Sequence, residues 1–211
     1  MAKLTSSPAR LEAFSDGVIA VIITIMVLEL KVPRASGMAG LREVLPTLGV
    51  YALSFSFVGV YWINHHHLVH RTEEADQAIL YSNLFFLFSL SLLPFFTAYL
   101  IQQKMDSFSV LLYVLSMMLT GAAFMLVRLA IGRRLRRQGT LEAYDLAAEI
   151  KHWSSLGLYL LDIPLSFVHP QLAMGVIVLV MAIWIYPSAP IPVKTSGESQ
   201  AKSSSSPVEP S

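Results

Sequence analysis

Long apolar runs separated by short polar connections make up most of the chain. A helix that crosses a bilayer needs about 20 largely apolar residues, because each residue advances the helix axis by about 1.5 Å across about 30 Å of hydrocarbon. Six runs approach this length, at residues 11–30, 44–65, 78–101, 108–131, 147–168 and 172–186. The pattern therefore predicts an all-α membrane protein, with six transmembrane helices in residues 1–186.

Two of these runs contain irregularities. The fifth run is the least regular, because Glu149, Lys151 and Asp162 interrupt it and Pro164 stands near its end. Asp162 and Pro164 together predict an irregular helix end at that point. In the third run, Pro94 predicts a kink.

The last part of the chain has a different composition. Residues 187–211 are rich in proline and serine and nearly free of large apolar side chains. Such a segment cannot bury enough surface to offset the entropy of folding. We expect these residues to form a disordered tail.

Composition agrees with a membrane protein and excludes several kinds of chemistry. Of the 211 residues, 55% are hydrophobic and 14% charged, against about 25% charged in ordinary globular domains. A net charge of +1 favours neither a nucleic acid nor an acidic partner. The absence of cysteine excludes disulfides and thiolate metal sites. No HExxH, GxSxG or paired-carboxylate motif is visible, so we expect neither an enzyme nor a bound cofactor.

The positions of the positive charges predict the orientation of the chain. If the N-terminus lies inside, eleven of the fifteen Lys and Arg residues fall on cytoplasmic flanks, many of them in the RRLRRQG connection between the fourth and fifth runs. Cytoplasmic flanks carry such an excess, so both termini are predicted to be cytoplasmic. The same basic run could also contact anionic lipid headgroups, although a determinant of topology is the simpler interpretation.

Asp16 is the most informative polar residue, because it stands inside the first apolar run. Residues 17–28 alone would cover only about 18 Å of helix, too little to cross the bilayer, so the span must include Asp16. One alternative is that Ser15 or Asp16 is an N-cap at headgroup level. A buried carboxylate in a span needs a polar partner.

Partners for Asp16 are available at the matching depth, in the sequence YWINHHH that ends the second run. Hydrogen-bond donors there, and Arg10 two turns before Asp16, predict a polar network that ties the first two helices together. Its predicted members are Arg10, Phe14, Ser15, Asp16, Trp62, Asn64, His65 and His66. His66 and His70 have metal-ligand spacing, but with no third ligand at helical spacing, histidines at the membrane interface are the preferred interpretation.

The motif R-x-x-x-F-S-D at Arg10–Asp16, followed by an apolar helix and by YWINHHH, resembles the potassium channel family called transmembrane protein 175. The resemblance implies a bacterial member with one six-helix unit per chain, in the bacterial inner membrane. It also implies a homotetramer surrounded by lipid, with the first helices around a central pore for potassium ions.

The resemblance further implies which residues line that pore. Family positions five, eight, nine and twelve after the motif aspartate correspond to Val21, Thr24, Ile25 and Leu28. These residues also share one stripe of the helix, since they are spaced i, i+3, i+4 and i+7. The first position usually holds isoleucine or leucine, so the smaller Val21 leaves the tightness of the constriction open.

A pore lined by Val21, Thr24, Ile25 and Leu28 implies a channel with modest selectivity for potassium over sodium. Its hydrophobic constriction would gate by dewetting. No TVGYG loop is present to form a carbonyl filter. Asp16 could raise the cation concentration at the inner mouth, or be locked into a structural role, which we favour. The alternative function is a proton-coupled secondary transporter that uses Asp16 and the His65–His67 cluster as a relay, although no inverted repeat supports it.

Overall fold

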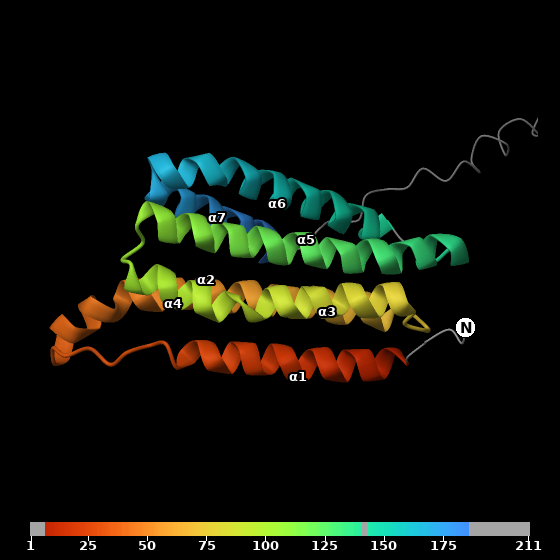
Figure 1. Cartoon of the computed structure of the whole chain (residues 1–211), viewed down its shortest axis with the longest axis horizontal. Coiled ribbons are helices and arrows are strands. Elements are labelled where there is room, and N and C mark those ends of the chain that lie inside the picture. Colours follow the sequence, from red (N-terminus) through yellow and green to blue (C-terminus); the bar gives the residue numbers. More distant parts are fainter. Residues whose placement is uncertain (1–6, 141–142, 186–211) are drawn as a thin grey trace, which may run out of the picture.

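The computed structural model describes residues 7–140 and 143–185, and all regular structure in that part is helical (Figure 1). It contains the helices α1 (Pro8–Val27), α2 (Gly37–His70), α3 (Gln77–Ser91), α4 (Leu93–Gln102), α5 (Ser107–Gln138), α6 (Ala143–Val168) and α7 (Pro170–Ile185). The predicted all-α fold is confirmed. The predicted tail at 187–211 lies outside the described residues.

Every predicted apolar run coincides with a helical rod, and the third rod is interrupted where the sequence predicted a kink. α3 ends at Ser91 and α4 begins at Leu93, with Leu92 at φ −79° and ψ −17° between them. Pro94 stands in the first turn of α4 and has no N–H for the carbonyl of Leu90, four residues earlier. This missing bond accounts for the interruption, and α4 nevertheless continues in line with α3, so that the two form one rod from Gln77 to Gln102 (Figure 1).

Three of the described helical rods are long and apolar enough to cross a membrane, judged by length and composition. They are α2, the α3–α4 rod from Gln77 to Gln102, and α5. α7 is apolar but short within the described range. α1 carries Arg10, Glu12 and Asp16 in its first half, and α6 also contains charged residues. Six spans per chain therefore stay a prediction.

Two predictions about helix ends were wrong. α6 continues through Pro164 to Val168, so Asp162 lies inside a helix rather than at an irregular end. The basic run RRLRRQG is not a connection but the end of α5, which stops at Gly139. Arg, Leu and Gln are good helix formers, and a left-handed glycine, here with φ +71°, is a common helix stop.

α5 forms the centre of the helical bundle, and α1 lies along one long edge of it (Figure 1). α5 packs against α2, α3, α4, α6 and α7, whereas α1 packs against α2, α3 and α4. Aromatic rings fill the middle of the bundle, where Phe124 of α5 lies 5.1 Å from Phe86 and 5.2 Å from Tyr61 between ring centroids. One face of α1 is thus buried in the chain, and its opposite face is not covered by it.

Candidate functional site

The two faces of α1 differ in position and in chemistry. The buried face consists of Leu11, Ser15, Ile19, Ile22 and Met26, which follow one another at helical spacing. This face includes the serine of the FSD motif and packs against the bundle. The opposite face is exposed, yet its central part is almost entirely apolar. Exposed apolar surface of this extent is typical of contact with lipid or with another protein chain.

The predicted pore stripe lies on the exposed face of α1. The exposed fractions are 54% for Val21, 44% for Ile25 and 77% for Leu28, and Thr24 is also exposed. All four side chains are therefore left partly uncovered by the helices of their own chain. A single chain does not enclose them.

Thr24 is the polar member of this stripe, and its hydroxyl hydrogen is used within the helix. The hydroxyl oxygen lies 3.0 Å from the carbonyl oxygen of Ala20 and 2.9 Å from that of Val21, and donates to them. Because the hydroxyl acts as the donor in these bonds, its oxygen lone pairs stay available to face outward. Oxygen lone pairs are what a cation requires as a ligand.

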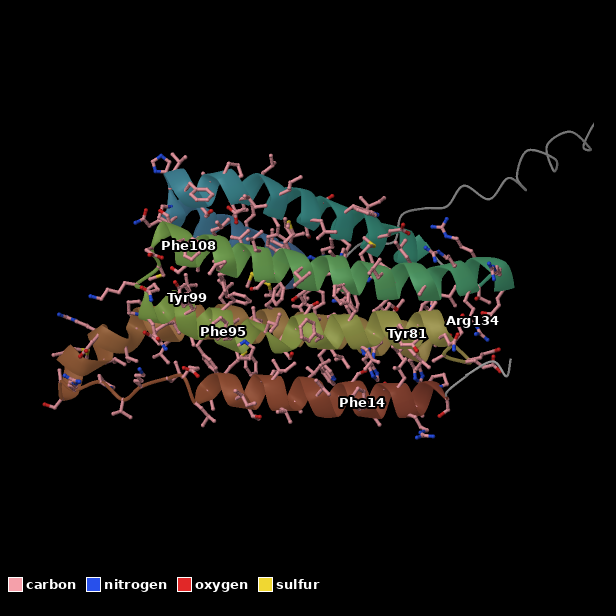
Figure 2. The ribbon with its side chains drawn as sticks, in the orientation of Figure 1. Phe14, Tyr81, Phe95, Tyr99, Phe108 and Arg134 are labelled. Atoms are coloured by element: carbon pink, nitrogen blue, oxygen red, sulfur yellow. The ribbon has the colours of Figure 1, made fainter. Side chains whose placement is uncertain are left out.

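A groove with a volume of about 920 Å³ runs along the exposed side of α1, between α1 and α4. On α1 it is lined by Phe14, Val21 and Ile25, and on α4 by Phe95 and Tyr99 among others. Figure 2 labels Phe14 on α1 and the two aromatic residues of α4. The phenylalanine of the FSD motif thus belongs to this apolar groove and not to the polar network.

On the buried side, a chain of hydrogen bonds joins three helices. The Asn83 side chain of α3 donates from Nδ2 to Ser15 Oγ at 2.9 Å, and Ser15 Oγ donates to the carbonyl of Leu11 at 2.8 Å. Asn83 Oδ1 lies 2.7 Å from His65 Nε2, which donates to it. Ser15, His65 and Asn83 are all fully buried. This chain fixes the rotation of α1 relative to α2 and α3.

Two further contacts between α1 and α2 lie beside this chain. Trp62 Nε1 donates to Asp16 Oδ1 at 2.8 Å, and His66 Nδ1 pairs with the carboxylate of Glu12. The Trp62 and His66 rings stack at 6.2 Å between centroids. The Asp16 carboxylate thus has a hydrogen-bond partner in α2. Because Asp16 is only half-buried, part of its side chain remains exposed at the surface of the chain. We call Glu12, Ser15, Asp16, Trp62, His65, His66 and Asn83 the polar cluster.

The structure leaves three predicted members outside the polar cluster, namely Phe14, which lines the apolar groove, Arg10 and Asn64. Arg10 is exposed, and the described residues contain no hydrogen bond or ion pair between Arg10 and Asp16. Asn64 donates to the carbonyl of Val60 in its own helix at 2.8 Å. On a helix, residues two apart point about 200° apart, so Asn64 lies on nearly the opposite side of α2 from His66, which contacts α1.

The alternative that Asp16 caps the start of the first helix is wrong. α1 begins at Pro8, with Ser7 at the N-cap position, so Asp16 lies more than two turns inside the helix. Proline is favoured in the first turn because its missing N–H would have no intrahelical acceptor there.

Sequence reasoning missed two members of the polar cluster, Glu12 and Asn83. Glu12 stands four residues before Asp16, so helical spacing places both on one face of α1. Asn83 carries an amide within the otherwise apolar run AILYSNLFFLF. An amide inside a span requires a partner from another helix, and that signal was available.

The histidines at the end of α2 do not gather into a metal site in this structure. His65 bonds to Asn83, His66 pairs with Glu12, and the His66 and His70 rings stack at 5.9 Å between centroids. Within residues 7–140 and 143–185, no group of three or more His, Cys, Asp or Glu side chains could hold a metal ion.

Comparison with known proteins relates these features to one family. A family model described as "Endosomal/lysosomal potassium channel TMEM175" matches residues 10–94. That range contains α1 from its third residue, all of α2 and α3 and the start of α4, and therefore the whole polar cluster and the pore stripe.

Two curated bacterial relatives match nearly the whole chain. A potassium channel of Chryseobacterium sp. (strain P1-3) is 40% identical over 178 residues, which cover 84% of this chain and 92% of the relative. A potassium channel of Streptomyces collinus is 31% identical over 200 residues, covering 88% of this chain and 95% of the relative.

A solved structure shares the fold. It is described as a lysosomal potassium-selective channel TMEM175 homolog from Chamaesiphon minutus, and it aligns with a TM-score of 0.71 at 28% identity. The alignment covers 84% of this chain and 96% of that one.

Proposed function

The chain belongs to the TMEM175 family of ion channels, and on this premise we propose that it is a potassium channel formed by four copies around a pore lined by α1. The observation that carries the proposal is the position of the pore stripe. Val21, Thr24, Ile25 and Leu28 lie on the uncovered face of a helix at the edge of the chain. Such a stripe encloses a pore only when several copies bring their α1 helices together.

The polar cluster supports this assembly by holding α1 in one orientation. Hydrogen bonds from Asn83 and Trp62 to two adjacent motif residues, Ser15 and Asp16, oppose rotation of α1 about its axis. Each copy then presents the same stripe to the axis. We assign Asp16 a structural role on this basis, because its carboxylate is bonded to Trp62 of α2.

Conduction in this proposal depends on the width of apolar rings. A ring of Val21 side chains conducts when it is wide enough to stay wetted and closes by dewetting when it narrows. Sodium holds its water more tightly than potassium, so a narrow apolar ring disfavours sodium. The outward-facing oxygens of Thr24 supply a few contacts in place of lost water. The resulting preference for potassium is modest, since no carbonyl filter is present in the sequence.

We place the protein in a bacterial inner membrane, with both termini in the cytoplasm. The bacterial origin of the relatives supports the first part. The distribution of Lys and Arg supports the second.

The test is a current measurement on purified protein in planar bilayers. We expect unitary currents that are larger in potassium than in sodium. Val21→Phe should reduce the unitary conductance several-fold, because a bulky ring narrows the constriction. Val27→Phe is the matched control, since Val27 is a valine of α1 that is exposed but stands outside the stripe.

Two results would contradict the proposal. Equal conductance of the Val21→Phe and Val27→Phe proteins would show that the stripe does not line the pore. Transport driven by a pH gradient without unitary currents would favour the proton-coupled transporter instead.

A further inference from the structure

The buried face of α6 is polar and much of its exposed face is apolar, the reverse of a helix at the surface of a water-soluble protein. Leu160, Leu161 and Phe167 are 61%, 70% and 59% exposed. An ionisable side chain inside a predicted span marks a candidate functional site, and one stands in the polar row. The buried members of this row recur every three or four positions and are His152, Ser155, Tyr159, Asp162 and Ser166.

Asp162 is the carboxylic acid of this row, and it has no hydrogen-bond partner. By contrast, His152 bonds to the carbonyl of Gly121 at 2.8 Å, and Ser155 and Ser166 donate to carbonyls of their own helix. Neither carboxyl oxygen of Asp162 finds a donor within residues 7–140 and 143–185. Because Asp162 is 1% exposed, its neighbours leave no room for a further side chain to reach it.

The helices packed against α6 supply no positive charge at the level of Asp162. These helices are α5 and α7. Asp162 stands about ten residues after His152, which bonds to Gly121, so it lies about level with residue 111 of the antiparallel α5. Residues 107–127 of α5, 153–168 of α6 and 170–185 of α7 contain no Lys, Arg or His.

The titratable groups around Asp162 are tyrosines. Tyr159 stands one turn earlier on α6 and interacts electrostatically with Asp162, with Tyr61 of α2 and with Tyr113 of α5. A tyrosine carries no positive charge in either of its forms, so none of the three balances a charge on Asp162. The charged or ionisable residues beyond these stretches are exposed and are Lys104, Asp106 and His169.

A carboxyl group in these surroundings is far less costly to bury in its neutral form than as an unpaired ion. Pro164, two residues further on, has no N–H for the carbonyl of Leu160, so α6 is held by one backbone bond fewer beside Asp162. We propose that Asp162 is a proton-binding site that keeps its proton at pH values where an exposed aspartate is ionised. Release of this proton at higher pH loosens α6 from α5 and α7. The site lies away from the pore stripe and does not depend on its assignment.

Infrared spectroscopy of the protein in lipid detects the proton directly, because a neutral carboxyl has a C=O stretching band above the amide I band. At about pH 5.5, well above the ordinary pKa of an aspartate, the spectrum of the parent minus that of Asp162→Asn should contain this band. The band should shift in heavy water and disappear at alkaline pH. Asp16→Asn is the matched control, since the Asp16 carboxylate accepts a hydrogen bond from Trp62, and this variant should keep the band. The proposal is overturned if the parent has no such band or if Asp162→Asn retains it.

Thermal unfolding gives an independent measurement of the same site. Raising the pH from about 5 to about 9 should lower the melting temperature of the parent by several degrees relative to Asp162→Asn. The reason is that the folded chain keeps a proton that the unfolded chain releases, so stability falls as pH rises. Asparagine imitates the neutral acid and has no proton to lose. Parallel pH dependences of the parent and Asp162→Asn would overturn the proposal.

Discussion

The amide of Asn83 joins three helices through one side chain. Its Oδ1 accepts from His65 of α2, and its Nδ2 donates to Ser15 of α1. All three side chains are buried, where water does not replace a missing partner. In a membrane protein, where apolar side chains gain little by leaving lipid for the bundle, hydrogen bonds of this kind help to select which helix faces meet.

We predict that Asn83→Leu lowers the free energy of unfolding by about 1–3 kcal/mol, because His65 Nε2 and the Ser15 oxygen lose a buried partner. Thermal unfolding in detergent measures the change. Asn64→Leu is the control, since the Asn64 amide bonds to a carbonyl of its own helix, and its loss should be smaller. Equal losses would mean that the bonds between helices do not stabilise the bundle more than a bond within one helix.

At the scale of the element, helix ends show how local chemistry sets the length of α5. Asp106 is the N-cap, and its carboxylate accepts from the Ser109 N–H at 2.8 Å. Gly139 ends the helix in a left-handed conformation. Between these signals α5 has 32 residues, or about 48 Å, which is longer than the hydrocarbon is thick.

The cap at Asp106 predicts a dependence of stability on pH. Ser109, through its hydroxyl and its backbone N–H, lowers the pKa of the Asp106 carboxyl below its ordinary value of 3.8. A lowered pKa in the folded state means that the charge stabilises the fold above the unfolded pKa, and that this stabilisation is lost as pH falls through the folded pKa. The melting temperature of the parent should therefore exceed that of Asp106→Asn at neutral pH, and the difference should vanish below the folded pKa.

Asp106→Ala supplies the reference for this measurement. Asparagine keeps a capping oxygen and alanine does not, so the alanine variant should melt below the asparagine variant at every pH. A difference between parent and Asp106→Asn that stays constant with pH would contradict the role of the charge.

At the scale of the whole molecule, the chain is asymmetric across its width. α1 lies along one long edge and α6 along the opposite edge (Figure 1). The edge at α1 combines the pore stripe with the apolar groove of about 920 Å³ beside α4. In the proposed tetramer the α1 edge faces the other copies, and the α6 edge faces lipid.

Cysteine cross-linking tests this arrangement directly, because the chain contains no cysteine of its own. Oxidation of the Thr24→Cys protein in membranes should produce disulfide-linked species between copies, since its sulfurs would meet near the axis. Leu161→Cys is the control, because Leu161 is 70% exposed on α6. Cross-linking of the Leu161→Cys protein but not of the Thr24→Cys protein would show that α1 lies away from the central axis of the assembly and that α6 lies between copies. The mass of the intact complex should correspond to four chains.

Much of the architecture and part of the site could be predicted from sequence. The six apolar runs became helical rods, because a backbone in lipid must satisfy its hydrogen bonds within the helix and therefore needs a set length of apolar residues. The interruption near Pro94 followed from its missing N–H. The FSD motif and the histidine-rich end of α2 indicated the family, which the relatives confirm. Each of these features is local in the chain.

The tertiary structure alone decided which of the candidate polar groups meet and which face of α1 stays uncovered. Asn83 lies 68 residues from Ser15, so no local period indicates that pair, whereas Trp62 was already among the predicted partners of Asp16 because of its matching depth. Arg10 was a closer candidate along the chain, but its side chain points outward. The physical reason is that hydropathy records only whether a side chain avoids water. It does not distinguish lipid, a neighbouring helix and a second copy of the chain, and only packing separates these three surroundings.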